Sequence, residues 1–487
     1  MTRFIWPLPF WLLASGFWLL ASKLPRPPSP ISSYYFPMPF GRLFRGRSPE
    51  PSPENKPDDA VTDDNAVADE ESAESDVPPE WDASGDDLER SWRTRASDVI
   101  PGSSSTGSKR AEALYGKGND SGPTHYVRAQ GCRLTTPSEL SLIDCTMALG
   151  SVAVGYADER ILRAAFSAAA NGNVAGLAHT AEVELAERLC DLIPAAERVQ
   201  FFKTGADAMS AAVRLARTAT GRTTVVGSGY FGWHDWSSSS AGVPDGVRQS
   251  FHDVAFDDVQ ALEAACRRAG NDLAAVVLEP VVERLPSEAW IASARRLCDE
   301  LGAVLVFDEM KTGFRLARGG YQELSGVTPD LATFGKALAN GFPLAALVGK
   351  SAVMEASKRT WISTTLAGES MSIAAALAVI EIYEGEDDVC ATLGRVGQAM
   401  RSSVEAAVAA SGTEGVTFAG LDQMWFMRFE DSTLERRFIE EGVREGVLFK
   451  RGAYNYASLA HDEEDTIVEI ERAASSALVA LVNGPEE

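Results

Sequence analysis

The chain has 487 residues, of which 45% are hydrophobic, so it is long enough for two or three domains with sizeable cores. Its net charge is −24 at neutral pH, from 45 basic and 69 acidic residues. A nucleic-acid binder needs a basic surface to displace counterions from phosphate, so this composition excludes a general nucleic-acid-binding role. The six cysteines show no CxxC pair and no repeated spacing. They predict no metal site or disulfide framework, and are interpreted as unpaired thiols of a reducing compartment.

The first 22 residues form an apolar segment with one positive charge, Arg3, near its start. The uncharged run at 4–22 has a length between that of a signal-peptide core and that of a membrane span. Residues 1–22 are therefore predicted to be a signal peptide or a membrane anchor. Any membrane contact of the chain is expected to involve this segment alone.

Residues 23–95 are predicted to be a disordered linker. The part at 24–49 lacks acidic residues and is rich in Ser, Pro and Arg, which suits either a plain linker or a transit segment. A transit segment behind a signal peptide would direct the chain through the secretory route to an organelle such as a plastid. From Glu50 to Glu89 there are 16 acidic residues and one basic residue. Such a stretch buries too little apolar surface to offset the entropy of ordering, so folded chain is expected to begin between Ala96 and Ala111.

Beyond this point, short apolar runs alternate with segments that have helical spacing of apolar residues. The run at 273–278 is almost continuously apolar, as expected for a strand that is buried on both faces of a parallel sheet. This alternation predicts an α/β class with a mostly parallel sheet. The predicted elements are, in chain order, strand 199–202, helix 207–218, strands 223–226 and 273–278, helix 288–301, and strands 303–307, 331–334 and 344–348.

Chemically useful residues follow several of these predicted strands. Ligands of open α/β sheets bind beyond the carboxyl ends of the strands, where this chain has a glycine turn, an aromatic residue, two carboxylates and a lysine. The glycine turn joins a strand to a helix, so it presents free N–H groups that can bind phosphate. These residues are Thr204, Gly205 and Ala206, then Gly229 and Tyr230, then Glu279, Asp308 and Lys336.

Each of these features also suits a structural role when it is taken alone. The glycine turn could bind nothing, Asp308 could cap the next turn, and Lys336 could be a solvated lysine at a strand end. Taken together, they match the needs of pyridoxal 5′-phosphate (PLP), with pyridoxamine 5′-phosphate as its alternate form. The cofactor needs a phosphate anchor, a stacking partner, a carboxylate against its ring nitrogen and a lysine for a Schiff base. Asp308 would keep the ring nitrogen protonated. Lys336, once released by the substrate amine, could carry a proton.

Two segments carry a family resemblance, FDEMKTGFR at 307–315 and GVTPDLATFGKALANG at 326–341. They resemble the class III (subgroup II) aminotransferases, in particular glutamate-1-semialdehyde 2,1-aminomutase and the aminotransferases related to it. The likeness runs from about Ser108 to the C-terminus. It implies a homodimer of PLP-dependent transferase fold type I, with a large domain at 166–385 around a mostly parallel seven-stranded sheet. A smaller α+β domain would combine 96–165 with 386–487.

The resemblance also implies roles for individual residues. Lys336 would form the Schiff base, and Asp308 would pair with the ring nitrogen. The other cofactor contacts would be two phosphate N–H donors, a residue on each ring face, a pocket carboxylate, and a threonine that reaches the phosphate bound in the partner subunit. In the same order, these are Gly205 and Ala206, Tyr230 and Met310, Glu279, and Thr365.

The chain departs from the family pattern at several positions. Ala206 stands where Ser or Thr is common, Phe231 replaces a usual His, and Lys311 adds a positive charge. The sequence TTLAGE at 364–369 differs from the GTLSGN that is usual in the aminomutase, and favours the related aminotransferases.

Two questions stay open at the level of sequence. The first is whether the amino group is transferred between two small substrates, as in an aminotransferase, or within one, as in an aminomutase. The second is whether the chain is instead a catalytically inactive fold-type-I binding or scaffold protein, tethered by its N-terminal segment. Ala206 and Phe231 mildly favour a scaffold, whereas the presence of Lys336 and Asp308 favours an enzyme.

Overall fold

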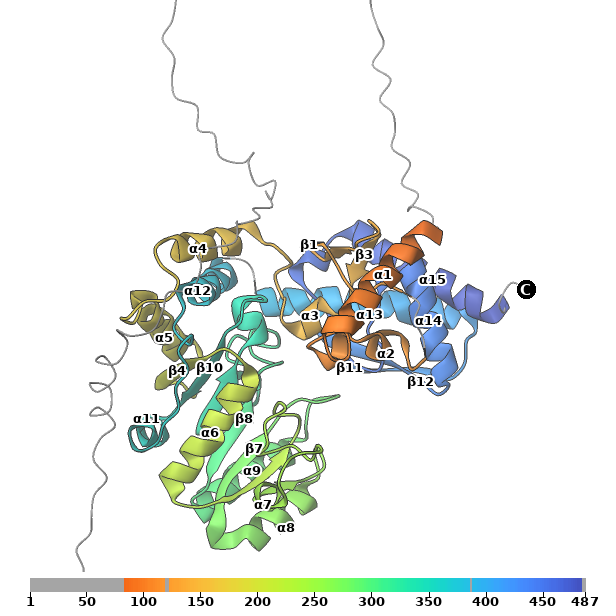
Figure 1. Cartoon of the computed structure of the whole chain (residues 1–487). Helices are drawn as coiled ribbons and strands as arrows, with labels where there is room; N and C mark the ends of the chain where they lie inside the picture. The colour runs from red at the N-terminus through yellow and green to blue at the C-terminus, as the bar shows by residue number, and fades with distance from the viewer. Residues whose placement is uncertain (1–82, 119–121, 386–387, 484–487) are drawn as a thin grey trace, which may run out of the picture. The chain divides into compact units, whose positions relative to one another are not determined.

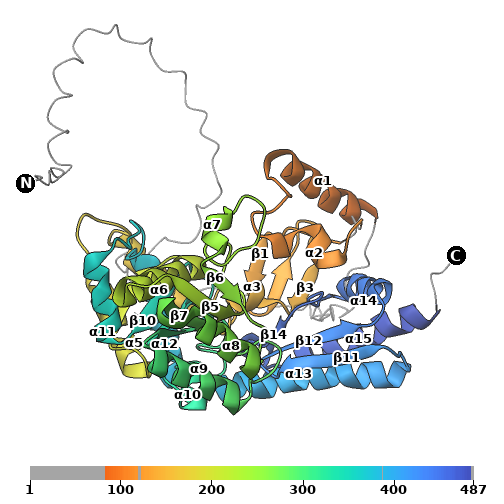
Figure 2. The ribbon, with the colours of Figure 1, turned by 90° about the horizontal axis from the view of Figure 1, so that it is seen from below.

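The computed structural model describes residues 83–118, 122–385 and 388–483 (Figures 1 and 2). The predicted signal or anchor segment at 1–22 and most of the predicted linker lie outside these residues. Within the described residues, no helix combines the length and the apolar character that a membrane crossing requires.

The first helix, α1 (Ala83–Val99), begins inside the segment that was predicted to be linker. Its Glu89 is fully buried and accepts hydrogen bonds from the backbone N–H and the hydroxyl group of Ser138, at 3.2 and 2.8 Å. Folded chain therefore starts earlier than the predicted Ala96. Composition indicated disorder here because a count of charges does not reveal that one carboxylate has a partner in the folded domain.

A seven-stranded sheet forms the centre of the larger domain, in the order β4-β10-β9-β8-β7-β5-β6. Strands β5 to β9 pair in parallel, and β10 is antiparallel to its neighbours β4 and β9. The predicted class and the mostly parallel sheet are confirmed. The sequence did not indicate β6, which has three residues, two of them exposed. The strands are β4 (Arg198–Phe202), β5 (Thr224–Ser228), β6 (Phe251–Asp253), β7 (Leu273–Leu278), β8 (Val304–Asp308), β9 (Leu331–Phe334) and β10 (Ala345–Gly349).

Helices cover both faces of this sheet, as successive strand residues show. Val277 and Val306 belong to a cluster with α6 (Gly205–Thr220), whereas Leu278 and Phe307 belong to a second cluster. The second cluster includes α8 (Val259–Ala269), α9 (Glu288–Leu301) and α12 (Ser370–Gly385). Because both faces are covered, the strands read as continuous apolar runs rather than alternating ones. Helix α6 runs along the sheet in Figure 1.

The helix bounds follow from capping residues. Helix α9 has the predicted bounds, since the Ser287 hydroxyl accepts a hydrogen bond from the Trp290 N–H at 3.3 Å and Gly302 ends the helix in the left-handed region. The other helices of the larger domain are α4 (Glu159–Ala170), α5 (Thr180–Leu192), α7 (Asp245–Arg248), α10 (Tyr321–Ser325) and α11 (Ser351–Met354), with the short 3₁₀ turns η3 (Gly270–Asp272), η4 (Lys336–Ala339) and η5 (Glu355–Arg359). Helices α2 (Ala111–Tyr115) and α3 (Met147–Gly150) and the 3₁₀ turns η2 (Gly107–Lys109) and η6 (Leu459–His461) belong to the smaller domain.

The two ends of the described chain build a smaller α+β domain together. Strand β3 (Ser141–Asp144) pairs in parallel with β13 (Val447–Leu448), which lies about 300 residues later. Figure 2 shows these N-terminal strands beside the C-terminal elements. This arrangement confirms the prediction that both chain ends form one domain. Its other elements are β1 (Arg128–Gln130), β2 (Arg133–Thr135), β11 (Val416–Leu421), β12 (Met424–Phe429), β14 (Asn455–Tyr456), α13 (Val389–Ser411), α14 (Ser432–Arg444) and α15 (Glu464–Asn483).

Candidate active site

A cavity of about 770 Å³ lies where the strands of the large sheet end. Strands β4, β5, β7, β8 and β9 run in the same direction, so the residues that follow them meet at one edge of the sheet. All cofactor residues predicted from the sequence except Thr365 line this cavity: Gly205, Ala206, Tyr230, Glu279, Asp308, Met310 and Lys336. Thr365 instead lines a second groove, whose other lining residues include 171–179, 363, 364, 367 and 368.

Lys336 begins the η4 turn after β9, and its backbone lies in the left-handed region with φ of 49°. Asn340, just after the turn, has φ of 43°. This region is uncommon for residues with a Cβ, so the surrounding contacts must hold it in place.

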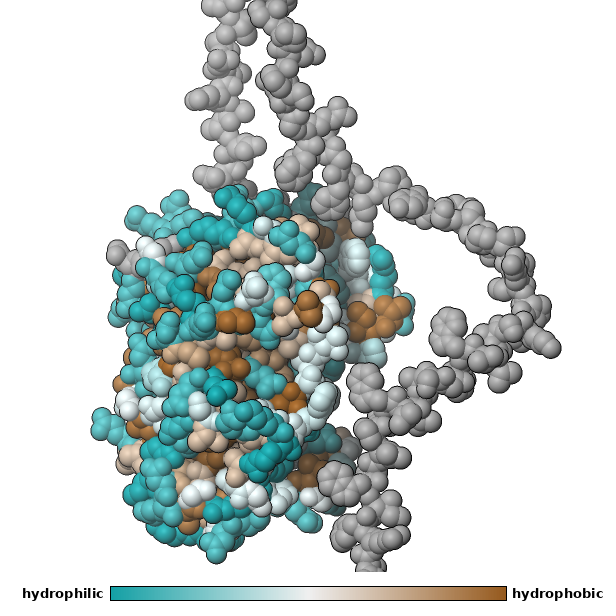
Figure 3. Space-filling model, turned by 90° about the vertical axis from the view of Figure 1, so that its left-hand side faces the viewer, coloured by the Kyte–Doolittle hydropathy of each residue, from teal (hydrophilic) through white to brown (hydrophobic). Residues whose placement is uncertain are grey.

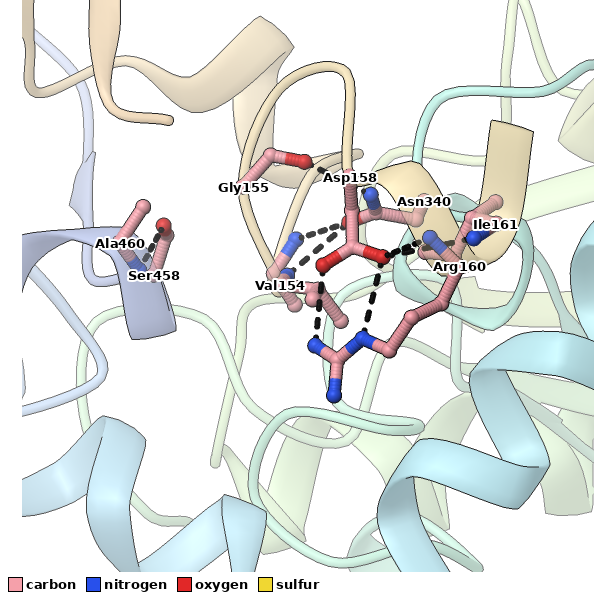
Figure 4. A network of polar contacts seen from close by, with 9 residues as sticks. Val154, Gly155, Asp158, Arg160, Ile161, Asn340, Ser458 and Ala460 are labelled. Carbon is pink, nitrogen blue, oxygen red and sulfur yellow. Dashed lines mark hydrogen bonds and ion pairs between the residues drawn. The ribbon is translucent and has the colours of Figure 1, made fainter. Parts of the chain in front are cut away.

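The side chain of Asn340 supplies those contacts (Figure 4). Its Oδ1 accepts hydrogen bonds from the N–H groups of Ala153 and Val154 at 2.9 and 3.0 Å. Its Nδ2 donates to the carbonyl of Gly155 at 2.9 Å. The turn that carries Lys336 is thereby fixed to the segment at 153–155.

The carboxyl group of Asp308 is buried beside the cavity and accepts a hydrogen bond from the Met310 N–H at 3.0 Å. Burial and the negative charge of Glu279 raise the pKa of Asp308 to about 7. Burial and the positive charge of Lys311 lower the pKa of Lys336 to about 8, against the attraction of Asp308. An amine with a lowered pKa is a competent nucleophile near neutrality, which is the property that a covalent cofactor link requires.

The glycine turn predicted to bind phosphate forms the N-terminus of α6. The Thr204 hydroxyl accepts a hydrogen bond from the Asp207 N–H at 3.1 Å, which leaves the first-turn N–H groups of Gly205 and Ala206 without a helical partner. A Cβ on Gly232 would lie 2.6 Å from the Cβ of Ala206. A small residue at each of these positions allows the two segments to approach.

Close approach also explains two glycines around Met310. A Cβ at Gly205 or Gly335 would lie 2.9 or 2.7 Å from the Met310 sulfur, so the methionine packs directly on both turns. Phe231, which departs from the family pattern, is 2% exposed and stacks on Trp236 with ring centroids 5.6 Å apart. Its ring therefore belongs to the core, and its presence does not argue against a working site.

Glu279 and Lys311 form an ion pair in the cavity wall, with Oε1 and Nζ 2.6 Å apart. Glu279 Oε2 also accepts a hydrogen bond from the Tyr230 N–H at 3.1 Å. The Lys311 ammonium group lies 4.5 Å from the ring centroid of Tyr454. The ion pair thus connects the ends of β5, β7 and β8 with the C-terminal part of the chain.

Three residues of this region were missed by sequence reasoning. Arg315 is fully buried, and its guanidinium group donates to the carbonyls of Ala457, Gly150 and Gln423 at 2.8, 3.2 and 3.3 Å. It joins the turn after β8 to the smaller domain. The Asn-Gly pair after Lys336 was a turn signal that could have pointed to Asn340. Tyr454 lies on an irregular segment and gave no signal.

A helix N-terminus with free N–H groups, a buried carboxylate and a lysine of lowered pKa in one cavity at the strand ends match the requirements of a PLP-dependent enzyme of fold type I. The sequence pattern of the aminotransferase class III family matches residues 114–460, and the chain belongs to this family. Its cofactor is PLP, and its chemistry is the transfer of an amino group. The comparisons give no support to the inactive scaffold.

Similar proteins include both aminotransferases and aminomutases. The chain is 31% identical over 364 residues to 3-aminobutyryl-CoA aminotransferase of Cloacimonas acidaminovorans, covering 72% of this chain and 87% of the relative. It is 33% identical over 360 residues to 2′-deamino-2′-hydroxyneamine transaminase of Streptomyces kanamyceticus, covering 73% and 90%. It is 31% identical over 401 residues to glutamate-1-semialdehyde 2,1-aminomutase of Polynucleobacter necessarius, covering 74% and 92%.

Solved structures agree with the fold. The FumI protein of Sphingopyxis sp. MTA144, solved in its PLP internal aldimine form, superimposes with a TM-score of 0.77 at 29% identity, covering 82% of this chain and 97% of FumI. An omega-transaminase from Sphaerobacter thermophilus gives a TM-score of 0.73 at 22% identity, covering 80% and 97%, and shows the same fold.

Proposed function

We propose that this chain is an aminotransferase, which moves an amino group between two small substrates, with Lys336 as the covalent holder of PLP. The observation that carries the proposal is the shared cavity of the Lys336 amine, the Asp308 carboxylate and the N-terminus of α6. Bound PLP supplies an electron sink for the carbanion left when the substrate loses its Cα proton.

The protein groups act around that ring. Asp308 holds the proton on the ring nitrogen, since a buried carboxylate requires a charged or hydrogen-bonding partner. Lys336, as a free amine, takes the Cα proton and returns it. The N–H groups of Gly205 and Ala206 bind the phosphate. Two further residues pack on the ring faces and one forms the pocket wall, namely Tyr230, Met310 and Glu279.

The segment at 364–369 supports transfer between two substrates over transfer within one. Its Glu369 is buried and forms an ion pair with Lys203, with Oε1 and Nζ 2.7 Å apart. The asparagine usual at this place in the aminomutase carries no charge and cannot form an ion pair. The edge of the cofactor cavity is thus built differently from the aminomutase pattern. Two of the named relatives are transaminases, which agrees with this choice.

Amino donors can test this choice directly. Purified protein loaded with PLP is mixed with single donors from a panel of small amines and amino acids, and the visible absorbance is followed. We expect at least one donor to bleach the absorbance and release an equimolar amount of its carbonyl product, and a keto acid to restore it. An isomerised amine without release of a carbonyl product would contradict the aminotransferase and support the aminomutase.

We further propose a homodimer in which Thr365 reaches the phosphate bound in the partner subunit. The second groove, which Thr365 lines, has exposed apolar neighbours: Leu177 is 87% exposed, Trp361 81% and Leu366 53%. Figure 3 shows the molecule from the side of α4 and α5, where hydrophobic areas lie among hydrophilic ones. Apolar groups of this size are usually covered by a partner.

The dimer can be tested by light scattering on a sizing column. Leu177→Asp and Leu366→Asp are expected to halve the measured mass, because each places a charge in the proposed interface. Leu324→Asp is the matched control, since Leu324 is also exposed, at 56%, but lies on α10 outside the groove. A monomeric wild-type protein would contradict the proposal.

For residues 1–22, we propose a role as signal peptide or anchor that starts the secretory route. The uncharged apolar run behind Arg3 supports it. N-terminal sequencing of the protein from its own cells would show a start beyond residue 22 for a cleaved signal. An intact Met1 in a fraction free of membranes would contradict both forms of the proposal.

A further inference from the structure

Lys311 stands out among the charged residues of the cofactor cavity, because the family resemblance assigns it no role. It follows Asp308 by three residues, and its side chain is 12% exposed. A buried ammonium group is costly unless it is paired, so its position calls for an explanation. The Glu279 carboxylate pairs with it at 2.6 Å, and the Tyr454 hydroxyl lies 3.4 Å from its Nζ.

The neighbours of Lys311 fix it in place. Glu279 is itself held by the Tyr230 N–H, and the hydroxyl of Tyr454 donates to the carbonyl of Val282. The ammonium group therefore sits between a carboxylate from the end of β7 and an aromatic ring from the C-terminal segment. Glu279 raises the pKa of Lys311, so the lysine keeps its charge.

Without a cation here, the cavity would hold two buried carboxylates, Glu279 and Asp308, and one amine, Lys336. Like charges in a low-dielectric site raise the pKa of a carboxyl group, so Asp308 would tend to be neutral and could not hold a proton on the ring nitrogen. Lys311 opposes this effect at Asp308, and it also disfavours a second positive charge at Lys336.

The charged and titratable groups around Lys336 come from every segment that borders the cavity. Asp308 ends β8, and Lys311 and Arg315 follow it. Glu279 follows β7, Lys203 follows β4, Tyr230 follows β5, and Tyr454 lies between β13 and β14. Lys203 forms an ion pair with Glu369 at 2.7 Å, and the guanidinium group of Arg315 donates hydrogen bonds to backbone carbonyls. Among these cations, Lys311 lines the cavity and is the charge that, after burial, lowers the pKa of Lys336 most.

We propose that Lys311 is an electrostatic positioning residue, whose charge favours the ionised form of Asp308 and the free-amine form of Lys336. It acts through these two residues and through Glu279, without contact to the reacting atoms. The inference rests on the proposed attachment of PLP to Lys336.

The test is a pH titration of the visible absorbance of the PLP-loaded protein, which reports protonation of the lysine nitrogen bound to the cofactor. Lys311→Met keeps the length of the side chain and removes the charge. We expect it to raise the midpoint by roughly half a pH unit or more, because a nearby like charge is lost. Lys311→Arg should restore the wild-type midpoint, since it keeps the charge. Lys358→Met is the matched control, because Lys358 is 73% exposed and lies outside the cavity.

A second variant changes the opposite charge. Glu279→Gln is expected to lower the midpoint, because the negative charge that favours a protonated Lys336 is removed. Shifts in opposite directions would support an electrostatic role, since a packing defect has no reason to reverse its sign. An unchanged midpoint in Lys311→Met, or a shift of the same sign in both variants, would overturn the inference. A wild-type protein that takes up no PLP would overturn the proposed function instead.

Discussion

Replacement of Asn340 tests whether the turn that carries Lys336 is held by the hydrogen bonds of one side chain. Asn340→Gly removes the two bonds to the Ala153 and Val154 N–H groups and the bond to the Gly155 carbonyl, while glycine tolerates the φ of 43°. A buried polar group that loses its partner costs about 1–3 kcal/mol. Three such groups give an expected loss in the free energy of unfolding of about 3 kcal/mol or more.

Asn340→Ala separates the backbone term from the hydrogen bonds. Alanine loses the same bonds and must also adopt the left-handed region, which adds about 1 kcal/mol. Urea unfolding followed by circular dichroism measures both variants against Asn171→Ala. Asn171 makes its side-chain hydrogen bond on the surface, so its loss should cost less than about 0.5 kcal/mol. An Asn340→Gly variant as stable as the control would refute the role of the network, and equal stability of the glycine and alanine variants would refute the backbone strain.

Three further predictions concern the cavity and its support. Asp308→Asn should retain the PLP absorbance but lose at least about 100-fold in the rate of the half-reaction, because an amide cannot hold the ring nitrogen protonated. Stopped flow measures this rate, and a normal rate would contradict the role of Asp308. The pKa of Lys336 is lowered to about 8, so its amine loses its proton as the pH rises through about 8. Uptake of PLP by the cofactor-free protein should therefore accelerate in this pH range. An acceleration confined to pH values above 10 would show that the pKa of the lysine is not lowered. Arg315→Met should lower the free energy of unfolding by about 3 kcal/mol in urea, since three carbonyl groups lose their donor; a stability within about 0.5 kcal/mol of wild type would show that water replaces the guanidinium group.

The central sheet could be predicted because strands buried on both faces leave a strong pattern. The bounds of β7 at 273–278 and β9 at 331–334 agree with the sequence analysis, and helix 288–301 has both of its capping residues in the sequence. Strand β6 was not predicted from the sequence, because two of its three residues are exposed and leave no apolar run. The start of the folded chain was placed too late because composition cannot show that Glu89 has Ser138 as a tertiary partner.

The sequence could predict those cavity residues that lie at the carboxyl ends of the parallel strands. Residues at the carboxyl ends of parallel strands lie at one edge of the sheet, and this rule predicted that Gly205, Tyr230, Glu279, Asp308 and Lys336 lie together. Contacts from distant segments could not be derived in this way. Asn340 reaches the loop at 153–155 and Tyr454 reaches Lys311, and both contacts depend on how the smaller domain packs, which no local pattern encodes.

Reduction with borohydride tests most directly whether the amine of residue 336 holds the cofactor. The PLP-loaded protein is treated with borohydride and digested, and the peptides are analysed by mass spectrometry. We predict a phosphopyridoxyl group on Lys336 and none in Lys336→Ala, which should also be colourless. A modified peptide that contains any other lysine, such as Lys203 or Lys311 of the same cavity, would contradict the assignment.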